Sequence, residues 1–319
     1  MRILILGGTS FVGRAIGEAA LRHGAHLTLF TRGRTGTDLF PEATRLTGDR
    51  DTDDYRSLRE GEWDAVVDVS GYVPRHVAGA VEALGDRVGR HVFISSHAVY
   101  RREGVEGESD ESTPLRPERR DTEELTEDTY GPLKVACESD LRAAYGDRSS
   151  VVRCGRVAGP HDNQDAFTYW VRRASLGGRV ALPGVPEQPV QVVDSRDVAE
   201  LVLRLIETGR GGAFNASGPA EPTTLGGLIH TCAEAAGTEV EVVPVPVEAA
   251  PFLFPLVRRE SMWSTQRRSS ARARAAGMPA TPLAVTAADV LAWDRERGLP
   301  PLAHGFTAEQ EAALLAAHA

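Results

Sequence analysis

The chain has few cysteines and no recognisable spacing of metal ligands. Only three cysteines, Cys137, Cys154 and Cys232, occur among its 319 residues. An odd, widely spaced set is unsuited to a disulfide framework, and no His, Cys or carboxylate spacing is typical of a zinc site. The sequence therefore predicts reduced thiols, a cytoplasmic location and no bound metal.

Long apolar runs are missing as well. No stretch approaches the roughly 18 residues that are needed to cross a bilayer. The run Ile3–Leu6 near the first residue is also shorter than the ~7 residues of a signal-peptide core. We therefore expect no membrane association.

Positive charge is in deficit. The chain has 36 Lys and Arg residues against 45 Asp and Glu residues, which gives a formal net charge of -9. Because such a mean field repels a polyanion, we do not expect nucleic acid as a partner unless a local basic patch overrides it. The residues that carry chemistry point instead to a small-molecule substrate.

The first half of the chain alternates β-rich runs with helical patterns. Strands are predicted at residues 2–6, 26–30, 43–46, 63–69, 91–95 and 150–153, and helices at residues 13–23, 75–84 and 130–145. Strands separated by helices of this length are joined by right-handed crossovers, so they form a parallel sheet. The predicted fold class is α/β, with a Rossmann-type doubly wound parallel sheet and helices on both faces.

The pattern is looser beyond residue 153, where Gly and Pro cluster. Helices are predicted at residues 166–176, 195–208, 224–236, 286–297 and 307–317. Residues 267–274 form a basic run, which is either a solvated surface or a grip for a substrate phosphate.

A glycine-containing turn follows the first predicted strand, and a helical pattern begins directly after it. Its residues are Gly7, Gly8, Thr9, Ser10, Phe11, Val12 and Gly13. Gly7 permits a tight turn, and Gly13 lets the helix pack closely on the sheet. Backbone N–H groups at such a turn reach a pyrophosphate at the positive end of the helix dipole. The turn therefore predicts dinucleotide binding.

The end of the second strand indicates which dinucleotide is bound. An acidic residue about 20 positions beyond the glycines is typical of NAD binding, because it accepts from the ribose 2′-hydroxyl. Here the strand ends in Thr31-Arg32-Gly33-Arg34, and the first carboxylate after it is Asp38. Arg32 and Arg34 suit the 2′-phosphate of NADP, so NADP is favoured over NAD.

Tyr130 and Lys134 open a predicted helix, four residues apart and therefore on one face. Hydride transfer to a carbonyl leaves an alkoxide that needs a proton, and an ammonium beside a phenol is expected to lower the phenol's pKa from about 10. Lys134 is also placed to hold the nicotinamide ribose. Ser95 and Ser96, at the end of the fifth strand, supply hydroxyls to orient the carbonyl.

The joint order of these motifs resembles the extended short-chain dehydrogenase/reductases, which include NAD(P)-dependent epimerases and dehydratases. The matching segments are residues 7–13, 48–49, 95–100, 130–134, 153–160, 193–199 and 214–218. The resemblance implies that Ser96 acts with Tyr130 and Lys134, and that Asp49 binds the adenine. It further implies that the cofactor is lined by Val69, Ser70, Gly71 and Ser95.

The resemblance also implies a division of the chain and a homodimer. A dinucleotide-binding domain is expected at residues 1–153, with residues 190–220 returning to it. A smaller substrate-binding lobe is expected at residues 154–189 and 221–319. The residues proposed to contact substrate are His97, His161 and Gln191.

Three residues depart from the family pattern: Ser10, Cys154 and His97. Ser10 replaces the middle glycine of the turn, and Cys154 stands where a proline is usual. His97 replaces the Asp-Glu pair of the nucleotide-sugar 4,6-dehydratases, which argues against dehydration.

Three functions remain open from the sequence. The favoured one is net transfer of a hydride between NAD(P)(H) and a carbonyl or alcohol of a small metabolite. The second is a nucleotide-sugar epimerase that retains its NAD. The third is a non-catalytic protein on the same fold that senses dinucleotides or binds RNA.

Overall fold

A computed structural model describes residues 1–105, 107–251 and 254–318, which form two compact units. The first unit comprises residues 1–155, 195–216 and 268–279, and the second comprises residues 156–194, 217–267 and 280–319. Residues 268–279 thus belong to the first unit, whereas the sequence-based division assigned them to the substrate lobe. The local sequence pattern did not indicate that residues 268–279 belong to the first unit, because this placement depends on their packing against a strand that is distant in the sequence.

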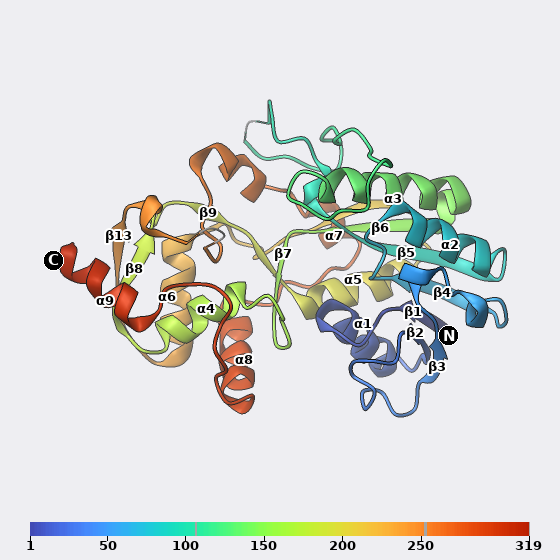
Figure 1. The fold of residues 1–319 in the computed structure, drawn as a ribbon, viewed down its shortest axis with the longest axis horizontal. Coiled ribbons are helices and arrows are strands. Elements are labelled where there is room, and N and C mark those ends of the chain that lie inside the picture. The colour runs from blue at the N-terminus through green and yellow to red at the C-terminus, as the bar shows by residue number, and fades with distance from the viewer. Residues whose placement is uncertain (106, 252–253, 319) are drawn as a thin grey trace. The chain divides into compact units, whose positions relative to one another are not determined.

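Within the described residues, the first unit is built on a seven-stranded sheet in the order β11-β6-β5-β4-β1-β2-β3 (Figure 1). Every neighbouring pair in it is parallel. The strands are β1 (Arg2–Leu6), β2 (His26–Thr31), β3 (Thr44–Thr47), β4 (Trp63–Asp68), β5 (Val88–Ser96), β6 (Ser149–Cys154) and β11 (Gly212–Ala216). The predicted α/β class with a parallel doubly wound sheet is confirmed.

Helices cover both faces of this sheet. They are α1 (Phe11–Arg22), α2 (Pro74–Leu84), α3 (Tyr130–Tyr145), α5 (Ser195–Glu207) and α7 (Ala271–Ala275). The α1 and α5 helices pack together, as do α2 and α3, and Figure 1 shows the two pairs on opposite sides of the strands. Because both faces are covered, central strands such as β1 and β4 are almost continuously buried.

The sheet brings distant residues to one edge. Strands β1, β4 and β5 are adjacent and parallel, so the segments that follow them leave from the same edge. Gly7 follows β1, Val69 follows β4, and Ser96 ends β5. Ligands of open α/β sheets bind at this edge.

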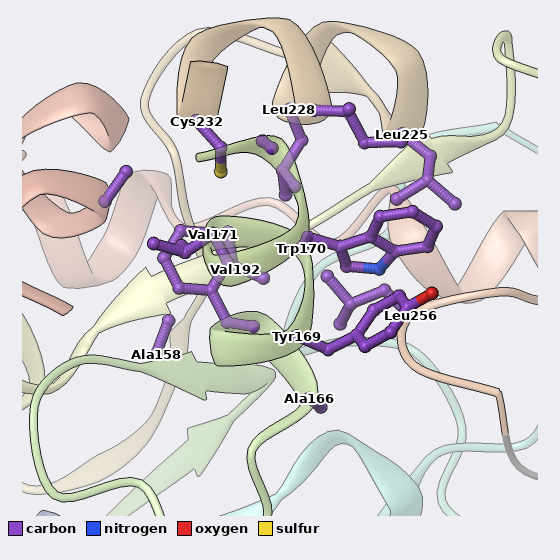
Figure 2. Close-up of a cluster of buried hydrophobic side chains, with 14 of the residues drawn as sticks. Ala158, Ala166, Tyr169, Trp170, Val171, Val192, Leu225, Leu228, Cys232 and Leu256 are labelled. Atoms are coloured by element: carbon purple, nitrogen blue, oxygen red, sulfur yellow. The ribbon is translucent and has the colours of Figure 1, made fainter. Parts of the chain in front are cut away.

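The second unit has its own apolar core. Its helices are α4 (Ala166–Ala174), α6 (Leu225–Ala236), α8 (Leu283–Glu296) and α9 (Ala308–Ala317). Its strands are β7 (Arg156–Ala158), β8 (Gly178–Pro183), β9 (Pro189–Val190), β10 (Val192–Asp194), β12 (Thr223–Thr224) and β13 (Val240–Val245). In Figure 2 the Trp170 indole lies among Leu225, Leu228 and Leu256, and its Nε1 donates to the Pro255 carbonyl at 2.9 Å. A buried indole thus has both apolar contacts and a partner for its N–H.

None of the described helices is long and apolar enough to span a bilayer. Cys137, Cys154 and Cys232 are all buried free thiols. Among residues 1–105, 107–251 and 254–318, no group of three or more His, Cys, Asp or Glu residues is arranged to hold a metal ion.

Candidate active site

The turn between β1 and α1 packs closely against the chain around it because two of its glycines lack a side chain. A Cβ on Gly7, whose φ is +106°, would lie 2.6 Å from Val69 Cγ2. A Cβ on Gly13 would lie 2.8 Å from the Gly8 Cα. Ser10 is the N-cap of α1, but its side chain makes no capping hydrogen bond. The N–H groups of the first turn of α1 therefore have no side-chain cap, and the turn fits a dinucleotide pyrophosphate.

A buried arginine fixes the strand ends beside this turn. Arg50 follows Asp49 in a short 3₁₀ turn, and its Nη1 and Nη2 donate to the two Asp68 carboxylate oxygens at 2.6 and 2.7 Å. Arg50 Nη1 also donates to Ser70 Oγ at 2.9 Å, and Ser70 Oγ donates to the Leu6 carbonyl at 3.0 Å. The residues after β1 and β4 are thereby tied together through one guanidinium.

The charge state of this pair follows from its surroundings. Asp68 is fully buried. Burial raises the pKa of its carboxyl, but attraction and hydrogen bonds from Arg50 outweigh burial and hold that pKa below its ordinary value. Asp68 is therefore a carboxylate at neutral pH, paired bidentately with a cation.

The two arginines after β2 lie beside the segment that carries Asp49. Arg34 Nη2 is 3.7 Å from Asp49 Oδ2, and Arg32 Nη1 is 3.4 Å from Asp51 Oδ2. About half of the Arg32 side chain and most of the Arg34 side chain are exposed. Exposed pairs of this kind are weak, at about 0–1 kcal/mol, so a phosphate can displace the carboxylates.

Tyr130 and Ser96 meet at the end of β5. Tyr130 begins α3, and its phenol lies next to the Ser96 side chain, which lowers the pKa of the phenol. Ser96 Oγ also accepts from the Ala98 N–H at 3.2 Å, which fixes the turn after the strand. The structure thus brings together a serine and a tyrosine that are 34 positions apart in the sequence.

Lys134, one helical turn after Tyr130 on α3, is buried, with 2% of its surface exposed. Its Nζ donates to the Gly71 carbonyl at 2.8 Å and to the Ile94 carbonyl at 2.7 Å. The ammonium also lies 4.0 Å from the centre of the Phe93 ring. Burial lowers the pKa of Lys134, and the nearby charges of Asp68 and Glu138 offset only part of this effect.

The expectation that Lys134 lowers the pKa of Tyr130 is wrong for this arrangement. Burial, with a smaller contribution from Tyr72, raises the pKa of Tyr130 to about 12, and the Ser96 side chain offsets only part of this. The Lys134 ammonium donates to two carbonyls. Tyr130 therefore retains its proton at neutral pH and can act as a proton donor.

Ser95 and His97 flank Ser96 but differ from it in their contacts. Ser95 Oγ is buried and donates to Glu138 Oε1 at 2.6 Å, so only its backbone remains for a cofactor. Burial, reinforced by Arg268 and Arg153, lowers the pKa of His97 to about 3. His97 is therefore a neutral imidazole near pH 7 and carries no proton to donate as an imidazolium.

The other two predicted substrate residues lie in the second unit. The His161 ring stands edge-on to Trp293, with the ring centres 5.5 Å apart. The Gln191 N–H donates to Gln266 Oε1 at 3.3 Å. Next to His161, Asp162 is buried, and burial raises the pKa of its carboxyl to about 6.

Sequence reasoning did not single out Arg50, Tyr72 or Glu138. Asp68 offered a signal, since a charged residue at the end of the run Trp63–Val69 needs a buried partner. Glu138 lies one helical turn after Lys134, and it accepts from Arg153 Nε and Nη2 at 3.1 and 2.7 Å. Tyr72, 44% exposed, offers no such signal in the sequence.

A sequence profile of the NAD dependent epimerase/dehydratase family matches residues 3–217. The chain belongs to this family. The match covers every segment that forms the site described in the first unit, from the glycine turn to Lys134. The resemblance to extended short-chain dehydrogenase/reductases is therefore confirmed.

Known proteins resemble this member of the family to different degrees. The chloroplast stem-loop binding protein of 41 kDa b from Arabidopsis thaliana is 26% identical over 260 residues, which are 76% of this chain and 65% of that protein. The chain thus matches less than two thirds of that relative's length.

Solved structures share the fold at low identity. UDP-glucuronic acid 4-epimerase from Bacillus cereus, in complex with NAD, is 15% identical, with a TM-score of 0.71 over 95% of this chain and 99% of that one. A human epimerase family protein with NADPH is 20% identical, with a TM-score of 0.65 over 91% and 99% of the two chains. Neighbours on this fold thus bind either nicotinamide cofactor.

Proposed function

We propose that this chain is an NAD(P)-dependent reductase that transfers a hydride to the carbonyl of a small metabolite. The observation that supports this most directly is the placement of the Ser96 side chain next to the Tyr130 phenol, on the helix that carries the buried Lys134 and in the same unit as the glycine turn. A bound nicotinamide cofactor would supply the hydride. Tyr130 would then donate its phenolic proton to the oxygen of the reduced carbonyl, and Ser96 would orient that oxygen.

The remaining groups have supporting roles in this proposal. Lys134 Nζ would bind a ribose hydroxyl of the cofactor. The N–H groups at the start of α1 would hold the pyrophosphate. Because burial raises the pKa of Tyr130 to about 12, the tyrosine is protonated at neutral pH and holds the proton that reduction of a carbonyl requires.

We propose NADP as the preferred cofactor, on the basis of Arg32 and Arg34. Replacing both arginines with alanine should weaken NADPH binding at least about tenfold and leave NADH binding unchanged. Each charge-assisted contact to a phosphate is worth about 1.5–3 kcal/mol, and only NADPH carries the 2′-phosphate. Affinities are measured by fluorescence titration of the nicotinamide.

Arg59 provides a matched control, because it is exposed in the same unit and makes no ion pair within the described residues. Arg59→Ala should bind both cofactors like the unchanged protein. Equal losses for NADPH and NADH in the double variant, or tighter NADH than NADPH binding in the unchanged protein, would contradict the preference.

A second candidate, an epimerase that retains its NAD, is favoured by the NAD-bound epimerase among the structural neighbours. In an epimerase the hydride returns to the substrate, so the dinucleotide stays bound in stoichiometric amount. Denaturing the purified protein and identifying the released dinucleotide by mass and absorbance separates the two reactions. We expect substoichiometric NADP(H), whereas one NAD per chain would favour epimerisation.

A third candidate, RNA binding, is favoured only by the name of the Arabidopsis relative. The net charge of -9 argues against it. Binding of an RNA hairpin that weakens steeply as salt is raised would support this function, and no binding would remove it. A cytoplasmic location and a homodimer remain predictions from the sequence.

A further inference from the structure

The basic run of residues 267–274 is not a uniform solvated surface in the structure. Arg268 is buried, with its guanidinium 4.3 Å from the centre of the Tyr100 ring and Nη1 donating to Ser109 Oγ at 2.8 Å. Arg272 is exposed on α7, and its guanidinium lies 4.8 Å from the centre of the Phe214 ring on β11. One arginine of the run is thus part of the interior, and another faces the outer strand of the sheet.

Arg272 lines a cavity of about 770 Å³ in the first unit. Its other walls come from residues 110–115, from Arg142 on α3 and from Arg153 on β6. None of the glycine turn, Ser96, Tyr130 or Lys134 lines it. The volume lies within the range of about 300–1,000 Å³ that is typical of small-molecule sites.

The carboxylates at this cavity are already hydrogen-bonded within the chain. Asp110 Oδ1 accepts from the Ser112 N–H at 2.8 Å and from Ser112 Oγ at 2.6 Å. Glu111 Oε1 accepts from the Asn215 N–H at 2.7 Å. Neither acid forms an ion pair with the arginines that line the cavity.

The arginines that line the cavity differ in whether a carboxylate pairs with them. Arg153 is held by Glu138 and by the Tyr100 hydroxyl. Arg142 and Arg272 are both exposed, and neither makes an ion pair within residues 1–105, 107–251 and 254–318. Arg142 and Arg272 thus line one cavity without a direct carboxylate partner in the described part of the chain.

We propose that this cavity is a second ligand site, separate from the dinucleotide site, and that it binds a phosphorylated small molecule through Arg142 and Arg272. A planar guanidinium donates two parallel N–H groups to the oxygens of a phosphate, and a pair of guanidiniums matches a doubly charged group. Thr113 and Ser269, which also line the cavity, add hydroxyls for the rest of the ligand. The site does not depend on the proposed hydride transfer.

The proposal is tested by calorimetric titration of the full chain, saturated with NADP⁺, with inorganic pyrophosphate. We expect one saturable site whose affinity falls at least about tenfold in the Arg142→Gln/Arg272→Gln variant. Arg59→Gln is the matched control and should bind like the unchanged protein. Both target side chains are exposed, so the far-ultraviolet circular dichroism of the double variant should also be unchanged.

Three results would overturn the proposal. The unchanged protein does not bind pyrophosphate, the double variant keeps the full pyrophosphate affinity, or Arg59→Gln loses as much pyrophosphate affinity as the double variant does. An RNA hairpin serves as a second probe. Arginine-dependent binding of the hairpin without binding of pyrophosphate would identify a polynucleotide surface and would also overturn the small-molecule site.

Discussion

Replacing Tyr130 with phenylalanine should leave cofactor binding intact and reduce turnover by at least about a hundredfold. The substitution removes one hydroxyl and keeps the ring at the start of α3. Without that hydroxyl the reduced carbonyl oxygen loses its proton donor. Turnover is followed as loss of nicotinamide absorbance with a panel of small aldehydes and ketones, and cofactor affinity by fluorescence titration.

Tyr145 provides the control for this variant because it is the last residue of the same helix. Its hydroxyl is buried and has no hydrogen-bond partner among the described residues, so Tyr145→Phe should leave turnover unchanged. Unchanged turnover in Tyr130→Phe would remove the tyrosine from the mechanism.

The pKa of Tyr130 adds a second readout to the same experiment. An acid with a pKa of about 12 stays protonated through the neutral range, so kcat/KM for reduction should be flat from about pH 6 to pH 9. Alcohol oxidation needs the phenolate, so its rate should rise with pH over the same interval. A fall in the reduction rate near pH 7 would assign the proton to another group.

Replacing Arg50 with alanine should lower the free energy of unfolding by about 3–5 kcal/mol. The change leaves the Asp68 carboxylate fully buried without its bidentate cation, which costs far more than loss of an exposed pair. It also removes the hydrogen bond to Ser70, so the end of β4 loses an attachment beside the glycine turn. Urea unfolding, followed by circular dichroism, measures the loss.

Two further measurements, on a double variant and as a function of pH, test whether the stability loss comes from the unpaired Asp68 carboxylate or from general disruption of the fold. Arg50→Met combined with Asp68→Leu removes both charges at similar volume and should recover most of the lost stability. In the unchanged protein the Asp68 pKa is depressed, so its contribution is present above the unfolded value of about 3.9 and is lost as pH falls below it. Without Arg50, burial raises the Asp68 pKa, so the variant protonates this carboxyl at a higher pH than the unchanged protein does. The gap in unfolding free energy between Arg50→Ala and the unchanged protein should therefore begin to narrow above the unfolded value and continue to narrow as pH falls further. A gap that is constant with pH would contradict the assignment.

The sequence predicted the parts of the fold that depend on local pattern. The helix expected at residues 130–145 is Tyr130–Tyr145, and the helix expected at residues 195–208 is Ser195–Glu207. Both have apolar residues at helical spacing. Strands such as β11 and β13 were not predicted, because their alignment depends on partners that are distant in the chain. Pairing at such separations leaves no local periodicity.

The candidate site was predictable to a similar extent. Gly7, Ser96, Tyr130 and Lys134 were identified because each occupies a recognisable position after a strand or on a helix face. The Arg50–Asp68 pair was missed, since either residue alone is an ordinary charged residue in the sequence. The pKa of Tyr130 was predicted in the wrong direction, because the sequence gives neither its burial nor the carbonyls that bind Lys134.

The first unit is completed only by segments that are synthesised late, and this bears on how the protein folds during translation. Residues 1–155 end with β6, whose outer side is paired by β11 at residues 212–216. At ribosomal speeds of about 5–20 residues per second, that side waits on the order of 3–12 seconds for its neighbour. The nascent chain therefore carries an unpaired strand edge during this interval, and this is the stage at which a chaperone or a second nascent chain has access to it.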